Sequence, residues 1–158
     1  YIYLTHWGYD GNIHNGRLVV HESVAKEIKE IFEVLFDKRF KIEKIRLIDD
    51  YRGSDDLSMA DNNTSAFNCR EVTGKPGVFS KHAYGTAIDI NPLVNPYVIK
   101  DKVLPPAGMK YVNRKLRVVG MIQKGDFVYQ VFIDHGWIWG GDWRTVKDYQ
   151  HFQKRFQR

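Results

Sequence analysis

The residues best suited to chemistry are a histidine and an aspartate seven positions apart, His82 and Asp89. They lie in a run of mostly small residues, Ser80 to Asp89, in which Gly85 permits a turn between them. Asp89 interrupts an otherwise apolar stretch, Ala87–Ile90. A carboxylate in such a stretch is costly to bury unless it is paired or binds a metal. We therefore expect a partner or a metal ion at Asp89.

A second carboxylate and a second histidine lie near the C-terminus, in Asp148-Tyr149-Gln150-His151. Their spacing places both on one side of a helical turn, or lets a tight turn deliver both to one pocket. Two imidazoles and a carboxylate make up the donor set of a catalytic zinc site, which leaves a fourth position for water. The hypothesis is zinc on His82, Asp89 and His151, with Asp148 as general base and acid. The alternative is a pair of hydrogen-bonded structural contacts.

Two motifs combine these residues: Ser80-x-His82-x-x-Gly85-x-Ala87-x-Asp89 and Asp148-x-x-His151-Phe152. Together they resemble the M15 family of zinc D-Ala-D-Ala carboxypeptidases, in particular its VanY-type members. The resemblance extends from about Gly8 onward and includes Tyr51-Arg52, Asn63–Arg70 and Gly136–Trp143. It implies an α+β fold of the Hedgehog/DD-peptidase type, one zinc ion per chain, and peptidoglycan stem peptides as substrate.

The resemblance also implies roles for individual residues. His82, Asp89 and His151 match the zinc ligands, and Asp148 matches a catalytic carboxylate that is Glu in many members. Arg52 resembles the arginine that stabilises the developing oxyanion. Ser80 matches a substrate-contacting serine, and Gln153 departs from the Glu that many relatives carry. Position in the chain adds three further candidates: Arg70 competes for the arginine role because it too follows the long loop, Tyr84 is a candidate cleft residue, and Trp143 is either a cleft residue or part of the core.

Simpler interpretations exist for several of these residues. Arg52 and Arg70 can pair with nearby carboxylates, which are Asp49, Asp50, Asp55 and Asp56. Asp55 and Asp56 themselves are expected to cap a loop or to be solvated. The other histidines lack the spacing of metal ligands and are expected to be ordinary, partly buried residues: His6, His14, His21 and His135.

The elements that must position the site begin with Tyr1–Val20, which we expect to form short strands with turns at Asp10-Gly11 and Asn15-Gly16. A helix with Ser23 as N-cap follows, because its apolar residues recur at helical spacing. These residues are Val24, Ile28, Ile31, Phe32, Leu35 and Phe36. A strand is expected within Ile42–Asp50, with Ile45 and Leu47 on one side.

The long polar stretch Tyr51–Ser80 contains scattered apolar residues, which indicates an ordered, functional loop. Beyond it we predict a strand at Ala87–Ile90, irregular chain over 92–116, and a helix at Asp126–Ile133 that ends at Gly136. In that helix, Phe127, Val128, Val131 and Phe132 should face inward. A strand at Trp137–Trp139 and a turn at Gly140-Gly141 complete the pattern. Strands and helices without βαβ alternation favour an α+β fold.

Length and composition limit the class of protein and the partners that we expect. The 158 residues are 43% hydrophobic and 27% charged, which fits one globular domain over residues 1–158. The net charge of +5 is modest and scattered, so nucleic acid is not expected as a partner. No apolar run approaches the length of a transmembrane span. A single cysteine, Cys69, permits neither an internal disulfide nor a multi-cysteine zinc site.

The leading hypothesis is therefore a zinc D-Ala-D-Ala carboxypeptidase that acts on peptidoglycan peptides as a monomer outside the cytoplasm. Because the chain begins at Tyr1, we expect an upstream signal or anchor segment that is absent here. An endolysin-like L-Ala-D-Glu endopeptidase is the nearest alternative. A non-catalytic, zinc-containing binding domain is a second alternative, although such a domain needs neither Asp148 nor an arginine.

Overall fold

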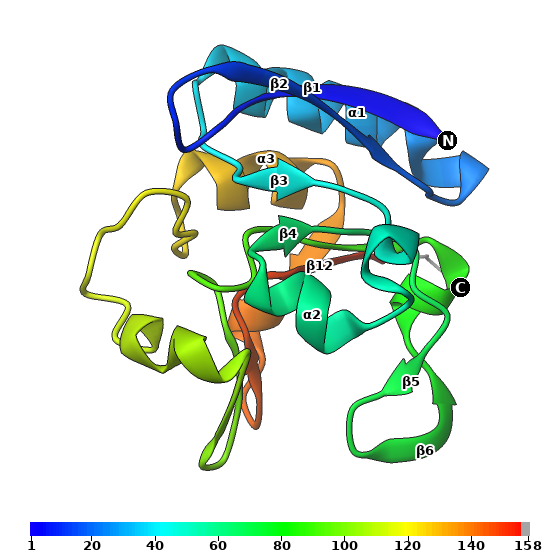
Figure 1. Cartoon of the computed structure of the whole chain (residues 1–158), viewed down its shortest axis with the longest axis vertical. Coiled ribbons are helices and arrows are strands. Elements are labelled where there is room, and N and C mark those ends of the chain that lie inside the picture. Colours follow the sequence, from blue (N-terminus) through cyan, green and yellow to red (C-terminus); the bar gives the residue numbers. More distant parts are fainter. Residues whose placement is uncertain (156–158) are drawn as a thin grey trace.

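The computed structural model describes residues 1–155 and confirms the α+β class. The α-helices are α1 (Glu22–Asp37), α2 (Asp55–Ala60) and α3 (Phe127–Asp134), and the 3-10 helices are η1 (Ile48–Tyr51), η2 (Lys81–Tyr84), η3 (Pro106–Tyr111) and η4 (Gly140–Asp142). The strands are β1 (Ile2–Trp7), β2 (Ile13–Leu18), β3 (Lys44–Ile45), β4 (Asn63–Thr64), β5 (Glu71–Val72), β6 (Lys75–Phe79), β7 (Ala87–Asp89), β8 (Tyr97–Ile99), β9 (Lys102–Leu104), β10 (Trp137–Trp139), β11 (Lys147–Asp148) and β12 (His151–Lys154). They form several small sheets rather than one large one (Figure 1).

The N-terminal hairpin of β1 and β2 packs with α1 at one end of the molecule (Figure 1). The predicted turn at Asp10-Gly11 is confirmed, and Gly11 has a φ of 83°. The predicted turn at Asn15-Gly16 is wrong, because both residues lie inside β2. A Cβ on Gly16 would lie 2.3 Å from the Cβ of Ile45, so glycine is needed there for close packing rather than for a turn.

Helix α1 buries the predicted apolar stripe, except that Phe36 is only half-buried. Its N-cap is His21 rather than Ser23, because the Ser23 backbone N–H donates to His21 Nδ1 at 3.2 Å. Helix α3 is also confirmed, with Asp126 as its N-cap. Phe127 is 41% exposed and not inward-facing as predicted, because it is the first residue of the helix; its ring forms a T-shaped pair with Phe40, with centroids 6.0 Å apart.

Two stretches contain more regular secondary structure than the sequence indicated: the chain between α1 and β7, and residues 92–116. The strand predicted within Ile42–Asp50 is limited to β3, and η1 follows it. The polar stretch Tyr51–Ser80 contains α2, β4 and the β5–β6 hairpin, which projects from the body of the molecule (Figure 1). The segment 92–116, predicted to be irregular, contains β8, β9 and η3.

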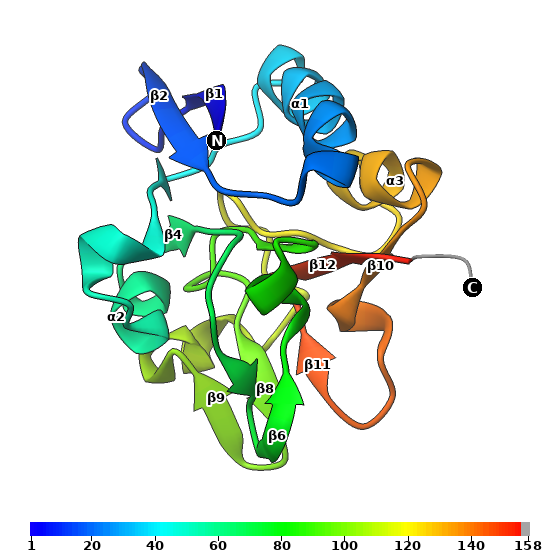
Figure 2. The ribbon, with the colours of Figure 1, turned by 90° about the vertical axis from the view of Figure 1, so that its right-hand side faces the viewer.

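A three-stranded antiparallel sheet, in the order β10-β12-β7, lies at the centre of the fold (Figure 2). Phe152 on β12 is fully buried and pairs in register with Ile88 on β7. It stacks on Phe132 of α3 with ring centroids 4.0 Å apart. One face of this sheet is therefore anchored in the hydrophobic core that α1 and α3 complete. The opposite face of β12 and β7 is available for a site.

Candidate metal centre and active site

His82 is positioned by the short helix η2. Ser80 caps this helix, since its Oγ accepts a hydrogen bond from the His82 backbone N–H at 3.3 Å. Gly85 ends it in the left-handed region, with a φ of 64°. A Cβ on Gly85 would lie 2.6 Å from the backbone nitrogen of His21, so no other residue fits without displacement. The serine and the glycine of the first motif are thus the two ends of the turn that carries His82.

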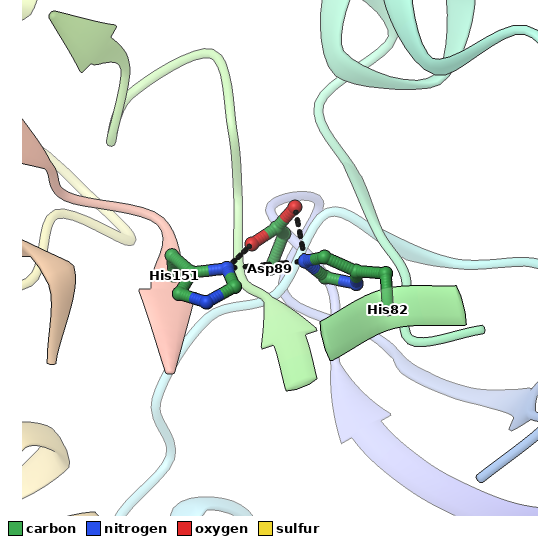
Figure 3. A group of neighbouring side chains, drawn as sticks. All are labelled: His82, Asp89 and His151. Atoms are coloured by element: carbon green, nitrogen blue, oxygen red, sulfur yellow. Dashed lines mark hydrogen bonds and ion pairs between the residues drawn. The ribbon is translucent and has the colours of Figure 1, made fainter. Parts of the chain in front are cut away.

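Asp89 and His151 are brought together by strand pairing. They are direct partners in the antiparallel ladder between β7 and β12, which places their side chains on one face. Of the two arrangements predicted for Asp148 and His151, the structure has the turn rather than the helix: β11 ends at Asp148 and β12 begins at His151. His151 Nδ1 lies 2.9 Å from Asp89 Oδ1, and His82 Nε2 lies 3.1 Å from Asp89 Oδ2 (Figure 3).

The outer nitrogens of both imidazoles are occupied. His82 Nδ1 donates to the backbone oxygen of Ala66 at 2.6 Å, and His151 Nε2 donates to Gln153 Oε1 at 3.1 Å. In the neutral rings these bonds leave His82 Nε2 and His151 Nδ1 without hydrogens, so their lone pairs face each other at 3.1 Å. Two lone pairs and a carboxylate in this arrangement require a cation among them, either a proton or a metal.

The donor set therefore fits a divalent metal ion. One ligand atom from each of His82, Asp89 and His151 lies within 4.8 Å of the other two, and all three residues are buried. Among residues 1–155 no other trio of histidine, cysteine or acidic side chains meets these conditions. The imidazole–oxygen bonds to Ala66 and Gln153 are the outer contacts that orient metal-binding histidines in proteins. Two imidazoles and a carboxylate suit zinc.

The electrostatics of the three residues agree with a charged centre. Burial alone would raise the pKa of the Asp89 carboxyl, but His82 and His151 hold it well below its usual range. Burial alone would lower the pKa of His151, but its hydrogen bond to Asp89 raises it above the usual value.

Asp148 lies beside this cluster on β11. A Cβ on Gly140 would lie 2.7 Å from the Asp148 Cβ, so the predicted turn residue Gly140 is required for η4 to approach β11. The Oδ1 atom of Asp148 is buried and has no hydrogen-bond partner within residues 1–155. Burial raises the pKa of this carboxyl to about 7. The cross-strand partner of Asp148 is Tyr97, whose side chain lies on the same face of the β8–β11 pair.

The two candidate arginines differ in position. Arg70 Nη2 lies 3.8 Å from Asp89 Oδ2, and Arg70 Nε lies 3.1 Å from Asp55 Oδ2. Arg52 follows η1 with an exposed side chain, and within the described chain it forms no ion pair or side-chain hydrogen bond to these residues. Arg70 is therefore the arginine that the fold brings to the cluster.

The three remaining candidates differ in how close they lie to the cluster of His82, Asp89 and His151. Trp143 contacts His151, with ring centroids 5.4 Å apart. Ser80 is 6% exposed and serves the fold as the cap of η2. Tyr84 is 58% exposed on the same short helix. Trp143 is thus at the cluster, whereas Ser80 and Tyr84 border it through the segment that carries His82.

Two residues near the cluster were not identified from the sequence. Tyr97 lies in the stretch predicted to be irregular, and no spacing signal connects it to Asp148. Asp55 was expected to cap a loop or to be solvated, with an ion pair to an arginine as the alternative; it is half-buried and forms that ion pair with Arg70. The only sequence hint for Asp55 was that two arginines needed partners, and that hint allowed four different carboxylates.

Comparison with known proteins defines the class. A family model described as D-alanyl-D-alanine carboxypeptidase matches residues 73–154, just over half of the chain. The matched range contains His82, Asp89, Asp148 and His151. The chain belongs to the M15 family of peptidases, as the motifs indicated. No curated protein and no solved structure gives a match. No helix within residues 1–155 is long and apolar enough to cross a bilayer.

Proposed function

We propose that this protein is a zinc-dependent peptidase that hydrolyses peptidoglycan stem peptides, acting as a D-Ala-D-Ala carboxypeptidase outside the cytoplasm. The observation that carries the proposal is the convergence of His82, Asp89 and His151 beside Asp148. His82, Asp89 and His151 come from three separate elements, and the inward lone pairs of the two imidazoles require a cation. The membership of the chain in a peptidase family supports the same reaction class.

In the proposed reaction His82, Asp89 and His151 hold the metal. Zinc at that position supplies a Lewis acid that acidifies water and polarises the scissile carbonyl. Asp148 accepts a proton from the attacking water and gives it to the leaving amine. A carboxylate suits this dual role because it can both take up and release a proton, and burial of Asp148 favours its uptake. The buried, unpartnered Oδ1 atom is the acceptor for that proton.

We assign the oxyanion role to Arg70 rather than to Arg52. Negative charge develops on the carbonyl oxygen in the transition state, and a fixed cation near the metal ligands stabilises it. Arg70 lies against Asp89, whereas Arg52 is exposed at the end of η1. Trp143 and Tyr84 are proposed to line the substrate cleft, and Ser80 to approach the substrate from the cap of η2.

Mass spectrometry of defined muropeptides tests the proposal. The zinc-loaded protein should remove one terminal D-alanine from a pentapeptide stem, a chelator should stop the reaction, and added zinc should restore it. The His82→Ala variant should lose both zinc and activity. Cleavage between L-alanine and D-glutamate would replace carboxypeptidase by endopeptidase action. Stoichiometric zinc without cleavage of any peptide would refute the catalytic proposal and favour a binding domain.

A further inference from the structure

Asp55 has no part in the reaction as described above, yet its carboxylate meets Arg70 at the edge of the cluster. We propose that Asp55 is a positioning residue that fixes the Arg70 guanidinium beside the metal centre. This inference rests on the proposed function of Arg70. The carboxylate acts through the arginine and touches neither the substrate nor the metal.

Both oxygens of Asp55 are engaged. Asn68 Nδ2 donates to Oδ1 at 3.0 Å, and Oδ2 forms an ion pair with Arg70 at 3.1 Å from Nε, a contact whose angle is not that of a hydrogen bond. Asn68 is itself buried, and its backbone N–H donates to the His82 carbonyl at 3.2 Å. The carboxylate is thus connected to the same turn that carries the metal ligand His82. Its position follows that of the cluster rather than varying freely on the surface.

Arg70 lies between two carboxylates at unequal distances. The contact with Asp55 is 3.1 Å, whereas the contact with the metal ligand Asp89 is 3.8 Å. Without Asp55, the only acidic group in ion-pair contact with Arg70 in the described chain would be Asp89. The guanidinium would then move toward Asp89 and away from the oxyanion position. Asp55 holds the Nε side of the guanidinium and so keeps its distal Nη2 atom at 3.8 Å from Asp89 instead of in close contact with that carboxylate.

Asp56 provides a matched control. Both aspartates lie in the first turn of α2 after the N-cap Ser54, so both interact with the same helix terminus. Asp56 is exposed and forms no ion pair within residues 1–155. A loss seen in Asp55→Ala but not in Asp56→Ala therefore cannot come from the helix terminus alone.

The test is a double-mutant cycle on peptide hydrolysis by zinc-loaded protein. Arg70→Ala should lower kcat by about 10²–10³-fold, as loss of an oxyanion donor does. Asp55→Ala should lower kcat by about tenfold or more with little change in KM, and Asp55→Glu should recover part of the loss. In the Arg70→Ala background, removal of Asp55 should cost nothing further, because Asp55 acts only through the arginine. Independent, multiplying losses would overturn the proposal, as would wild-type kcat in Asp55→Ala.

A second readout does not depend on turnover. Arg70 Nε is buried beside the Asp55 carboxylate and has no hydrogen-bond partner within residues 1–155, so its exchange rate reports how firmly the ion pair holds the guanidinium in place. The Arg70 Nε–H resonance, assigned by its absence in Arg70→Lys, should be protected from exchange in the wild type and in Asp56→Ala. It should exchange at least tenfold faster in Asp55→Asn, which keeps the shape of the side chain and the fold. Equal protection in Asp55→Asn would refute the positioning role. If no peptide is cleaved at all, the proposed function fails, while this measurement still decides the placement of Arg70.

Discussion

Replacement of Asp148 by asparagine should stabilise the metal-free protein at neutral pH while it removes activity. In the folded protein burial raises the pKa of the Asp148 carboxyl to about 7, about three pH units above that of an exposed aspartate. The folded protein therefore keeps this proton at pH values where the unfolded chain has released it. Stability from this group is fully present below pH 4 and is lost as the pH rises toward 7.

The magnitude follows from the shift. Three pH units at 1.36 kcal/mol each correspond to about 4 kcal/mol for a fully buried group. The residue as a whole is half-buried although its Oδ1 atom is not exposed, so we expect about 2–4 kcal/mol. Asparagine does not titrate and lacks this loss. The difference in unfolding free energy, variant minus wild type, should thus increase by about 2–4 kcal/mol between pH 4 and pH 7.

Urea denaturation in the presence of a chelator measures this difference at several pH values. Groups distant from Asp148 titrate alike in both proteins, so the difference reports Asp148 together with its electrostatic coupling to His151 and Asp89. Asp101→Asn, at an exposed position between β8 and β9, serves as the control and should give a constant difference. In the zinc-loaded protein Asp148→Asn should keep its metal and lose about 10²–10⁴-fold in turnover. A pH-independent difference between wild type and Asp148→Asn would refute the reasoning.

Three further predictions concern single residues. Gln153→Leu removes the acceptor of the His151 Nε2–H bond and should weaken zinc binding by about 10–100-fold, measured by competition with a chromophoric chelator; unchanged affinity would show that the bond does not orient the ring. Gly85→Ala places a Cβ against the His21 backbone at a residue in the left-handed region. It should lower the free energy of unfolding by about 2 kcal/mol or more, measured by thermal or urea denaturation, and should weaken zinc binding. Gly53→Ala is the control: its Cβ would meet open space, so only the backbone strain should lower its stability. Arg70→Ala should lower kcat far more than Arg52→Ala does, and the reverse order would return the oxyanion role to Arg52.

The sequence allowed prediction of those parts of the site that depend on short-range patterns. The motif around His82 was recognisable because its serine, histidine, glycine and aspartate stand at fixed spacing within ten residues; the structure adds that the serine caps the short helix and the left-handed glycine ends it. Asp89 stood out because a carboxylate in an apolar strand needs a partner. The pairing of Asp89 with His151 across two strands was only a hypothesis, since strand register depends on contacts between distant segments.

Other features depended on tertiary contacts that no local pattern reveals. The segment 92–116 reads as irregular, but Arg114 orders it by donating to the backbone oxygens of Val94 and Ile122 and to Asn95 Oδ1. Gly16 was predicted to be a turn residue, but glycine is needed there because the backbone packs closely against Ile45. The choice between Arg52 and Arg70 depended on how the long stretch Tyr51–Ser80 folds back.

The alternation along β12 has a consequence for the evolution and folding of this protein. His151 and Phe152 are consecutive and point to opposite faces, one toward Asp89 and the other into the aromatic core. A slip of one residue in the pairing would exchange them, placing an imidazole among the core rings and a phenyl ring on the face that carries Asp89. Because burial of Phe152 in the core is favourable, the register of β7 and β12 that is shifted by one residue is disfavoured. Selection for a stable interior alone would preserve the correct alignment of the histidine, even before any ion is bound.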